Sequence, residues 1–130
     1  MKKFSLILFL SFISVMLFSQ TSYKTYCNLI GDENSLKKGI VSIRIDYGQE
    51  DLKDNKFVDE NGKEIKFRTM VSAMNFMSKL GWQLEQVYNC YDQIDGSPII
   101  IWVLSKNIIS EDEITKGFQT KLMYDKNHQK

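Results

Sequence analysis

The sequence predicts an α+β domain: a mainly antiparallel sheet of about four strands packed on one main helix, with a C-terminal helical extension. Two patterns carry this prediction. In residues 40–47 apolar and polar residues alternate, as in a half-buried strand, whereas in residues 69–80 apolar residues recur at every third or fourth position, as in a helix. The chain has 130 residues. About 110 remain once an apolar N-terminal segment is set aside, which suits a single core.

Residues 1–19 are expected to be a secretory signal peptide. Lys2 and Lys3 precede an apolar run, residues 4–18, that only three serines interrupt, and this is the layout of a cleaved export signal. A membrane anchor needs about twenty apolar residues, and this run is shorter. We therefore expect cleavage after Ser19, an exported protein in the periplasm or outside the cell, and no membrane insertion after cleavage.

The α+β domain is expected to span residues 20–106, and its first half supplies two strands and a turn. Residues 23–30 are rich in β-formers and end in a cluster of turn residues. The alternation in residues 40–47 predicts a strand with only one face in the core. The Asn-Gly pair that begins at Asn61 favours a short hairpin or loop.

The predicted main helix, residues 69–80, leads into two further strands. Gly81 follows it, where the end of a helix favours a residue in the left-handed conformation. The next strand is expected over residues 82–91, and a turn separates it from residues 99–104. This last strand is apolar on both faces, so something must cover each side.

Residues 107–130 are expected to form an amphipathic helix or tail. Ser110 and Glu113 have the spacing of a capping box, and apolar residues follow on one helical stripe. Gly117, in the middle, costs about 1 kcal/mol relative to alanine, so the helix should form only when docked. The second face of residues 99–104 is the expected docking surface, and a partner chain is the alternative cover for it.

Three stretches of the chain carry a resemblance: residues 67–84, FRTMVSAMNFMSKLGWQL, residues 101–106, IWVLSK, and residues 43–48, IRIDYG. On these stretches the chain resembles a set of small secreted bacterial proteins of unknown function. More distantly, the helix and the strands after it are similar to a short βαββ domain of unknown function, marked by a Gly-Trp-Glu-Leu junction in which Gln83 here replaces the glutamate. The resemblance spans roughly residues 23–106. It implies the fold and carries over no catalytic or binding residue.

Cys27 and Cys90 are the only cysteines, and both lie on predicted strands. In an oxidising compartment an even count favours a disulfide, which would stabilise the fold by roughly 4 kcal/mol in the chain-entropy model. The alternative is two buried free thiols that act as small apolar residues. The pair has no Cys-x-x-Cys spacing, which disfavours a redox enzyme.

The sequence offers no recognisable catalytic set. Its single histidine, His128, lies near the C-terminus, which argues against Ser-His-Asp catalysis and against a histidine-rich metal site. Carboxylates gather in residues 46–54, 59–64 and 111–113, the first two groups interleaved with lysines, as on a solvated surface. We expect no enzyme, no metal and no cofactor. A small secreted hydrolase that uses surface carboxylates is the alternative.

A binding role is therefore the leading expectation. The formal charge is +1, or −1 without the two lysines of the signal segment, so no nucleic acid partner is implied. The candidate interaction face is assigned to the side of the sheet away from the helix, where tyrosine and tryptophan favour contact with a partner. It consists of Tyr91, Ile100, Trp102 and Leu104. We expect an exported, non-enzymatic protein that binds another macromolecule, a protein, with a second copy of itself as one option.

Overall fold

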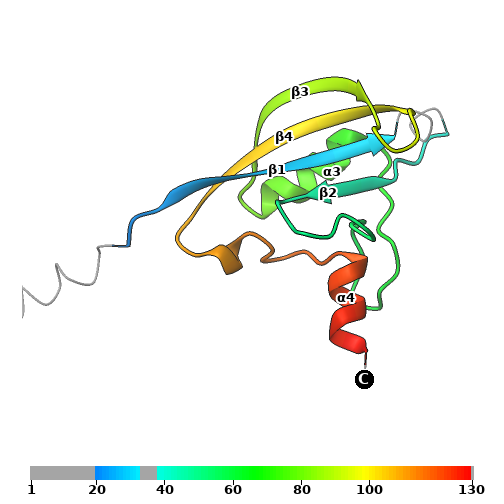
Figure 1. Ribbon diagram of the computed structural model, residues 1–130. Helices are drawn as coiled ribbons and strands as arrows, with labels where there is room; N and C mark the ends of the chain where they lie inside the picture. Colours follow the sequence, from blue (N-terminus) through cyan, green and yellow to red (C-terminus); the bar gives the residue numbers. More distant parts are fainter. Residues whose placement is uncertain (1–19, 33–37, 130) are drawn as a thin grey trace, which may run out of the picture.

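The computed structural model describes residues 20–32 and 38–129, and the predicted signal peptide, residues 1–19, lies outside this range. The described chain forms a four-stranded antiparallel sheet with two α-helices and a short 3-10 turn, which confirms the predicted α+β class (Figure 1). In chain order the elements are β1 (Tyr23–Asp32), β2 (Ile43–Asp46), α3 (Met70–Lys79), β3 (Gln83–Tyr91), β4 (Pro98–Ile108), η1 (Glu111–Glu113) and α4 (Lys121–His128).

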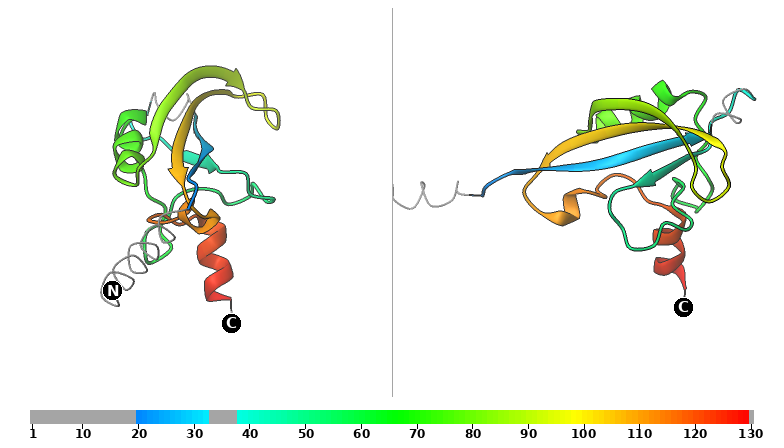
Figure 2. Two further views of the ribbon diagram at one scale, coloured as in Figure 1. Left: turned by 90° about the vertical axis from the view of Figure 1, so that its left-hand side faces the viewer. Right: turned by 45° about the horizontal axis from the view of Figure 1, so that its top comes forward.

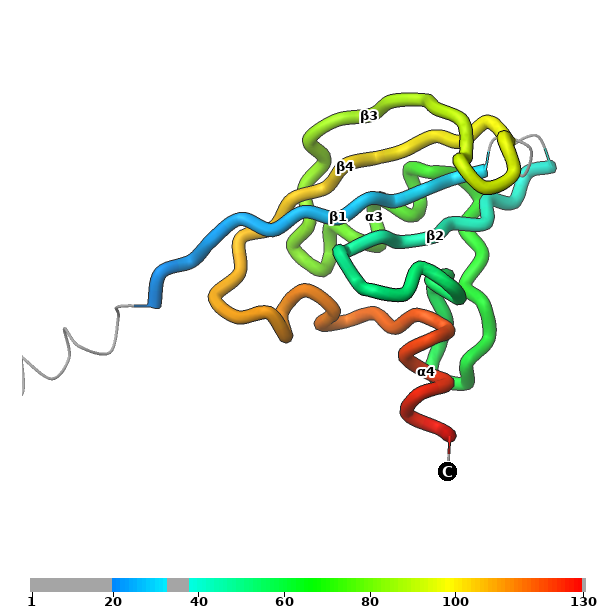
Figure 3. Tube along the Cα trace, in the orientation of Figure 1, coloured from blue at the N-terminus to red at the C-terminus, as the bar shows by residue number. Residues whose placement is uncertain are grey.

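The strands lie in the order β2-β1-β4-β3, and each pairs antiparallel with its neighbours. β1 pairs with β4 over its whole length, from Tyr23 opposite Ile108 to Asp32 opposite Ile99. The tube in Figure 3 follows these two central strands side by side. The shorter β2 and the long β3 are therefore the two edges of the sheet.

The register of the central ladder decides which side chains share a face, because residues directly opposite in an antiparallel pair point the same way. Leu29 lies opposite Trp102, and Cys27 lies opposite Leu104. These residues belong to the face that packs on α3, here called the helix face. The other face, here called the outer face, carries Ile101 and its neighbours two positions away. Figure 2 shows α3 on one side of the sheet only.

α3 begins and ends where the sequence predicts. The Thr69 hydroxyl accepts a hydrogen bond from the Ser72 backbone N–H at 3.1 Å, and the Ser72 hydroxyl accepts one from the Thr69 N–H at 3.1 Å, so two of the free donors at the helix start are satisfied. Gly81 takes the left-handed conformation, with φ +91°. The chain then returns as Trp82, which is fully buried in the core.

The C-terminal extension differs from the predicted continuous helix. Only the single turn η1 forms near the expected start, and the Ser110 side chain does not cap it. Gly117 then adopts a left-handed conformation, with φ +94°, and packs so closely on the Leu80 side chain that an added Cβ would clash with it. Since a left-handed residue interrupts a helix, α4 starts afresh after Thr120, whose hydroxyl accepts from the Met123 N–H at 3.4 Å.

The extension docks, but not on the outer face of β4 as expected. Ile114 and Phe118 enter the core on the helix side of the sheet, and the Phe118 ring meets the Phe57 ring edge-on at a centroid distance of 5.4 Å. Backbone hydrogen bonds hold the extension to residues 54–58, among them Lys121 N–H to the Lys56 carbonyl at 3.0 Å. The extension thus closes the end of the core and shares it with the sheet.

Replacing the buried Phe118 with alanine should therefore destabilise the whole domain and not just the tail. Removing a buried phenylalanine ring costs about 3–5 kcal/mol of unfolding free energy, and Phe118 is 9% exposed. Leu52→Ala, at a residue that is 55% exposed, is the control and should change the free energy by less than about 0.5 kcal/mol. Urea unfolding measures both, and equal effects would show that the extension is not part of the core.

Candidate functional site

The structure places most of the predicted interaction face inside the molecule. Leu104 is fully buried in the core, and Ile100 and Trp102 are partly buried against the same core. The expectation that they lie on the side away from the helix is wrong, because the β1 register turns all three toward α3. Tyr91 alone is strongly exposed, at the end of β3.

The outer face of β4 is covered in part by the chain's own β3–β4 turn. Figure 2 shows this turn curling over the side of the sheet opposite α3. The Arg44 Nη2 atom of β2 lies 2.6 Å from the Asp92 Oδ2 atom of the turn, so this ion pair ties the turn across the sheet. Ile99 and Ile101 point to the outer face and are nevertheless buried.

The exposed apolar side chains gather along β3 and the turn that follows it. Five of the eleven large apolar residues that are exposed in the described chain fall within residues 84–94, each 40% to 91% exposed. We call this group the β3 margin. It consists of Leu84, Val87, Tyr88, Tyr91 and Ile94. Exposed apolar side chains that gather on a small protein make this margin a candidate interaction surface.

The two edges of the sheet differ in how the rest of the chain covers them. The backbone of β2 is covered by the loop after it, since the Ile45 N–H donates to the Asn55 carbonyl at 3.0 Å and the Asn55 side chain donates back to the Ile45 carbonyl at 3.1 Å. β3 pairs with β4 on its inner side. Within residues 20–32 and 38–129 no strand pairs with its outer side, so this edge is open.

One carboxylate stands near the start of the open edge, and it is engaged within its own sheet. Glu85 occupies a bulge in the β3–β4 ladder. Its carboxylate accepts a hydrogen bond from the Ser105 hydroxyl and lies 3.4 Å from Lys24 Nζ. The Ser105 hydrogen bond, followed by the Lys24 charge, holds the pKa of Glu85 below its usual value. The remaining β3 residues, 86–91, carry no charge.

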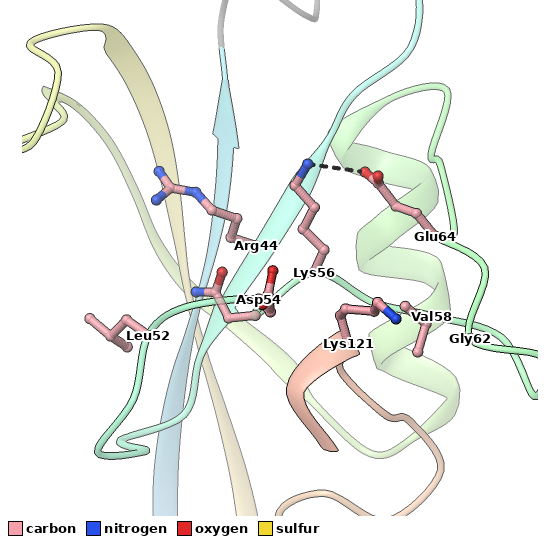
Figure 4. A pocket seen from close by; sticks show the side chains of 9 residues that line it. Arg44, Leu52, Asp54, Lys56, Val58, Gly62, Glu64 and Lys121 are labelled. Carbon is pink, nitrogen blue, oxygen red and sulfur yellow. Dashed lines mark ion pairs between the residues drawn. The ribbon is translucent and has the colours of Figure 1, made fainter. Parts of the chain in front are cut away.

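A pocket of about 410 Å³ lies beside β2, and charged side chains of both signs line it (Figure 4). Three cations line it, namely Arg44, Lys56 and Lys121. Each already has a carboxylate partner: Arg44 pairs with Asp92 at 2.6 Å, Lys56 with Glu64 at 3.6 Å and Lys121 with Asp125 at 2.6 Å. The pocket therefore offers a ligand little uncompensated charge.

Four carboxylates of the described chain have a lowered pKa, the opposite of what a general acid needs. Hydrogen bonds and neighbouring cations lower the pKa values of Glu85, Asp92, Asp95 and Asp112, whereas a carboxylic acid that donates a proton near neutral pH needs a raised one. In the part of the chain that is described, no three histidine, cysteine or acidic residues come together as metal ligands.

Cys27 and Cys90 lie far apart, so the expected disulfide is wrong. Both are free thiols. Cys27 lies opposite Leu104 and Cys90 lies opposite Ile99, which separates them by five residues, or about 16 Å, along β4. A disulfide needs Cα atoms within about 7 Å. Burial, with a smaller contribution from the nearby Asp46 charge, raises the pKa of Cys27 to about 12.

Comparison with known proteins adds no assignment to this geometry. No protein-family model matches the chain, and no curated protein or solved structure matches it significantly. The resemblance described above to small secreted proteins stays a prediction. Among the helices of the described residues, none combines the length and the apolar character needed to cross a membrane.

Sequence reasoning missed the two features that define this site. It assigned the turn at residues 92–98 no partner, although Asp92 reaches Arg44 across the sheet. It also did not single out β3 as an open edge. One local signal was available for the second feature, because residues 86–91, QVYNCY, form a β-prone stretch without charge, glycine or proline.

The two thiols should react at very different rates in the folded protein. At pH 8 an alkylating reagent should modify Cys90, which is partly exposed, and leave Cys27 untouched until the protein unfolds, because burial keeps it protonated. Mass spectrometry with and without denaturant counts the modified thiols. A denatured, unreduced protein that takes up no reagent would show a disulfide after all.

The ion pair between Arg44 and Asp92 should contribute to stability only above acidic pH. The Ile94 N–H, which donates to the Asp92 carboxylate at 2.8 Å, and Arg44 lower its pKa below the usual 3.8. The folded state thus favours the charged form, a contribution present above pH 3.8 and lost as pH falls through the lowered pKa. Asp92→Asn should reduce the unfolding free energy at pH 7, and its difference from the wild type should shrink as pH falls through the lowered pKa. A difference that does not change with pH would contradict this.

Proposed function

We propose that this is an exported, non-enzymatic protein that binds another protein chain through the β3 margin. One observation carries the proposal: within residues 20–32 and 38–129, five of the eleven exposed large apolar side chains lie along the one open edge of the sheet and the turn after it. Tyr88 and Tyr91 add aromatic area of the kind that is enriched in binding surfaces.

Both the backbone and the side chains of β3 support binding of an extended chain. Alternate N–H and C=O groups of an edge strand point away from the sheet, and an added strand satisfies them. Val87 points to the helix face beside Trp102, whereas Tyr88 points to the outer face beside Ile101. An added strand would therefore find apolar contacts on both faces of the sheet, each contributing about 1 kcal/mol on partial burial.

The charges near the sheet favour binding over catalysis. Asp54 and Glu64 both line the pocket beside β2, and Glu64 is already paired with Lys56. The lowered pKa of Asp92, which lies across the sheet, suits an ionised partner of Arg44 and not a proton donor. The export part of the proposal rests on residues 1–19, whose lysines and apolar run have the layout of a signal peptide.

A capture experiment tests the proposal. The tagged protein serves as bait for the proteins of its own extracytoplasmic fraction, beside a Tyr91→Asp/Ile94→Asp variant in the β3 margin. Because a charge on each residue opposes burial, recovery of the captured chain should fall at least about tenfold, the effect of 1.4 kcal/mol.

Val71→Asp is the matched control, since Val71 is an apolar residue of α3 that is 57% exposed. It should leave recovery unchanged, and mass spectrometry identifies what is captured. Equal recovery by the wild type and the Tyr91→Asp/Ile94→Asp variant would overturn the proposed surface. Loss of recovery with Val71→Asp alone would place the binding surface on α3.

A further inference from the structure

We propose that the chain that occupies the open edge of β3 is a second copy of this same chain. The two β3 strands would pair antiparallel about a two-fold axis and join two four-stranded sheets into one of eight strands. This inference rests on the proposed function, because it names the partner of the β3 margin. Three observations support it: the edge of β3 is poorly protected, residues 86–91 carry no charge, and the symmetric pairing leaves no further open edge.

First, beyond the bulge at Glu85, the edge of β3 lacks the features that keep edge strands apart. Natural edges are short, or carry lysine, proline or inward charges, or are covered by another segment. β2 follows this rule, being four residues long and covered by Asn55. β3 has nine residues, and six of them in succession, residues 86–91, contain no charge, proline or glycine. Uncharged β-prone stretches of this length associate unless they are covered.

Second, the charge pattern permits self-pairing. A two-fold axis places a strand opposite itself, so a charged residue near the axis would meet its own charge, which is destabilising. Residues 86–91 carry no charge, and the nearby Glu85 is already engaged with Ser105 and Lys24 of its own sheet. Residues 86–91 also offer no charge by which a foreign strand would be selected.

Third, pairing of the two β3 strands about a two-fold axis gives a closed dimer. A two-fold axis perpendicular to the sheet keeps both faces continuous. Since side chains alternate along a strand, odd-numbered residues then lie opposite odd-numbered ones and even-numbered opposite even-numbered ones. Within the regular stretch 86–91, an axis at Tyr88 or at Asn89 pairs the most residues, five on each strand. Either position covers apolar groups on both faces of the joined sheet and places Val87 within two residues of the axis. Only the β2 edges would remain at the two ends, and these are covered, so association stops at two copies.

Charge-swap variants at Val87 test the pairing, with oligomeric state as the readout. Sedimentation of the purified wild-type protein over about 1–100 µM should show a concentration-dependent dimer. Val87→Lys and Val87→Glu, each alone, should weaken association at least about tenfold, because like charges then meet near the axis. An equimolar mixture of the two variants should recover the dimer as a heterodimer.

Val71→Lys is the matched control, because it places the same charge on an exposed valine of α3. It should leave the dimer unchanged. Circular dichroism shows whether each variant is folded, and recovery of association in the mixture excludes simple unfolding as the cause. A wild-type protein that stays monomeric up to about 100 µM would overturn the inference. So would a dimer that neither charge at Val87 weakens.

The two proposals fail separately. If the protein is monomeric, yet capture returns a foreign protein that the Tyr91→Asp/Ile94→Asp variant loses, the β3 margin is a binding surface and the second copy is not its occupant. If capture returns the untagged native chain and the Val87 variants abolish that recovery, both proposals hold. If no chain is recovered and the protein is monomeric, both are wrong.

Discussion

The ladder between β1 and β4 is the constraint on which the other features of the fold depend. It pairs all ten residues of β1, and its register turns Leu29 and Trp102 to the helix face and Ile101 to the outer face. With these two strands at the centre, β2 and β3 become the edges. The loop after β2 and the C-terminal extension then close one side of the molecule, which leaves β3 as the open edge.

Elements with local signals could be predicted from the sequence. The three- and four-residue spacing that predicts residues 69–80 as helical corresponds to α3, Met70–Lys79, and Gly81 ends it in the left-handed conformation. The alternation in residues 40–47 contains β2 and correctly places Ile43 and Ile45 in the core. Each of these signals comes from residues a few positions apart, so it can be read from the sequence alone.

Features that depend on register between distant segments could not be predicted. Residues 99–104 are apolar on both faces, so the sequence alone does not say which face meets the helix, and only the pairing of Leu104 with Cys27 decides it. The same register separates Cys27 from Cys90. The capping-box spacing at Ser110 predicted a continuous helix that does not form. Gly117 instead adopts a left-handed conformation against Leu80, so tertiary packing outweighs the local helix signal.

The central ladder also bears on how the chain acquires its fold. Its paired residues are 67 positions apart at Asp32 and Ile99, and 85 apart at Tyr23 and Ile108. Contacts between such distant positions require large loops to close, and folding rates fall as this separation grows. β1, the first strand to be synthesised, has to wait for β4. The sheet of such a chain can therefore be completed only after almost all of the chain has been made.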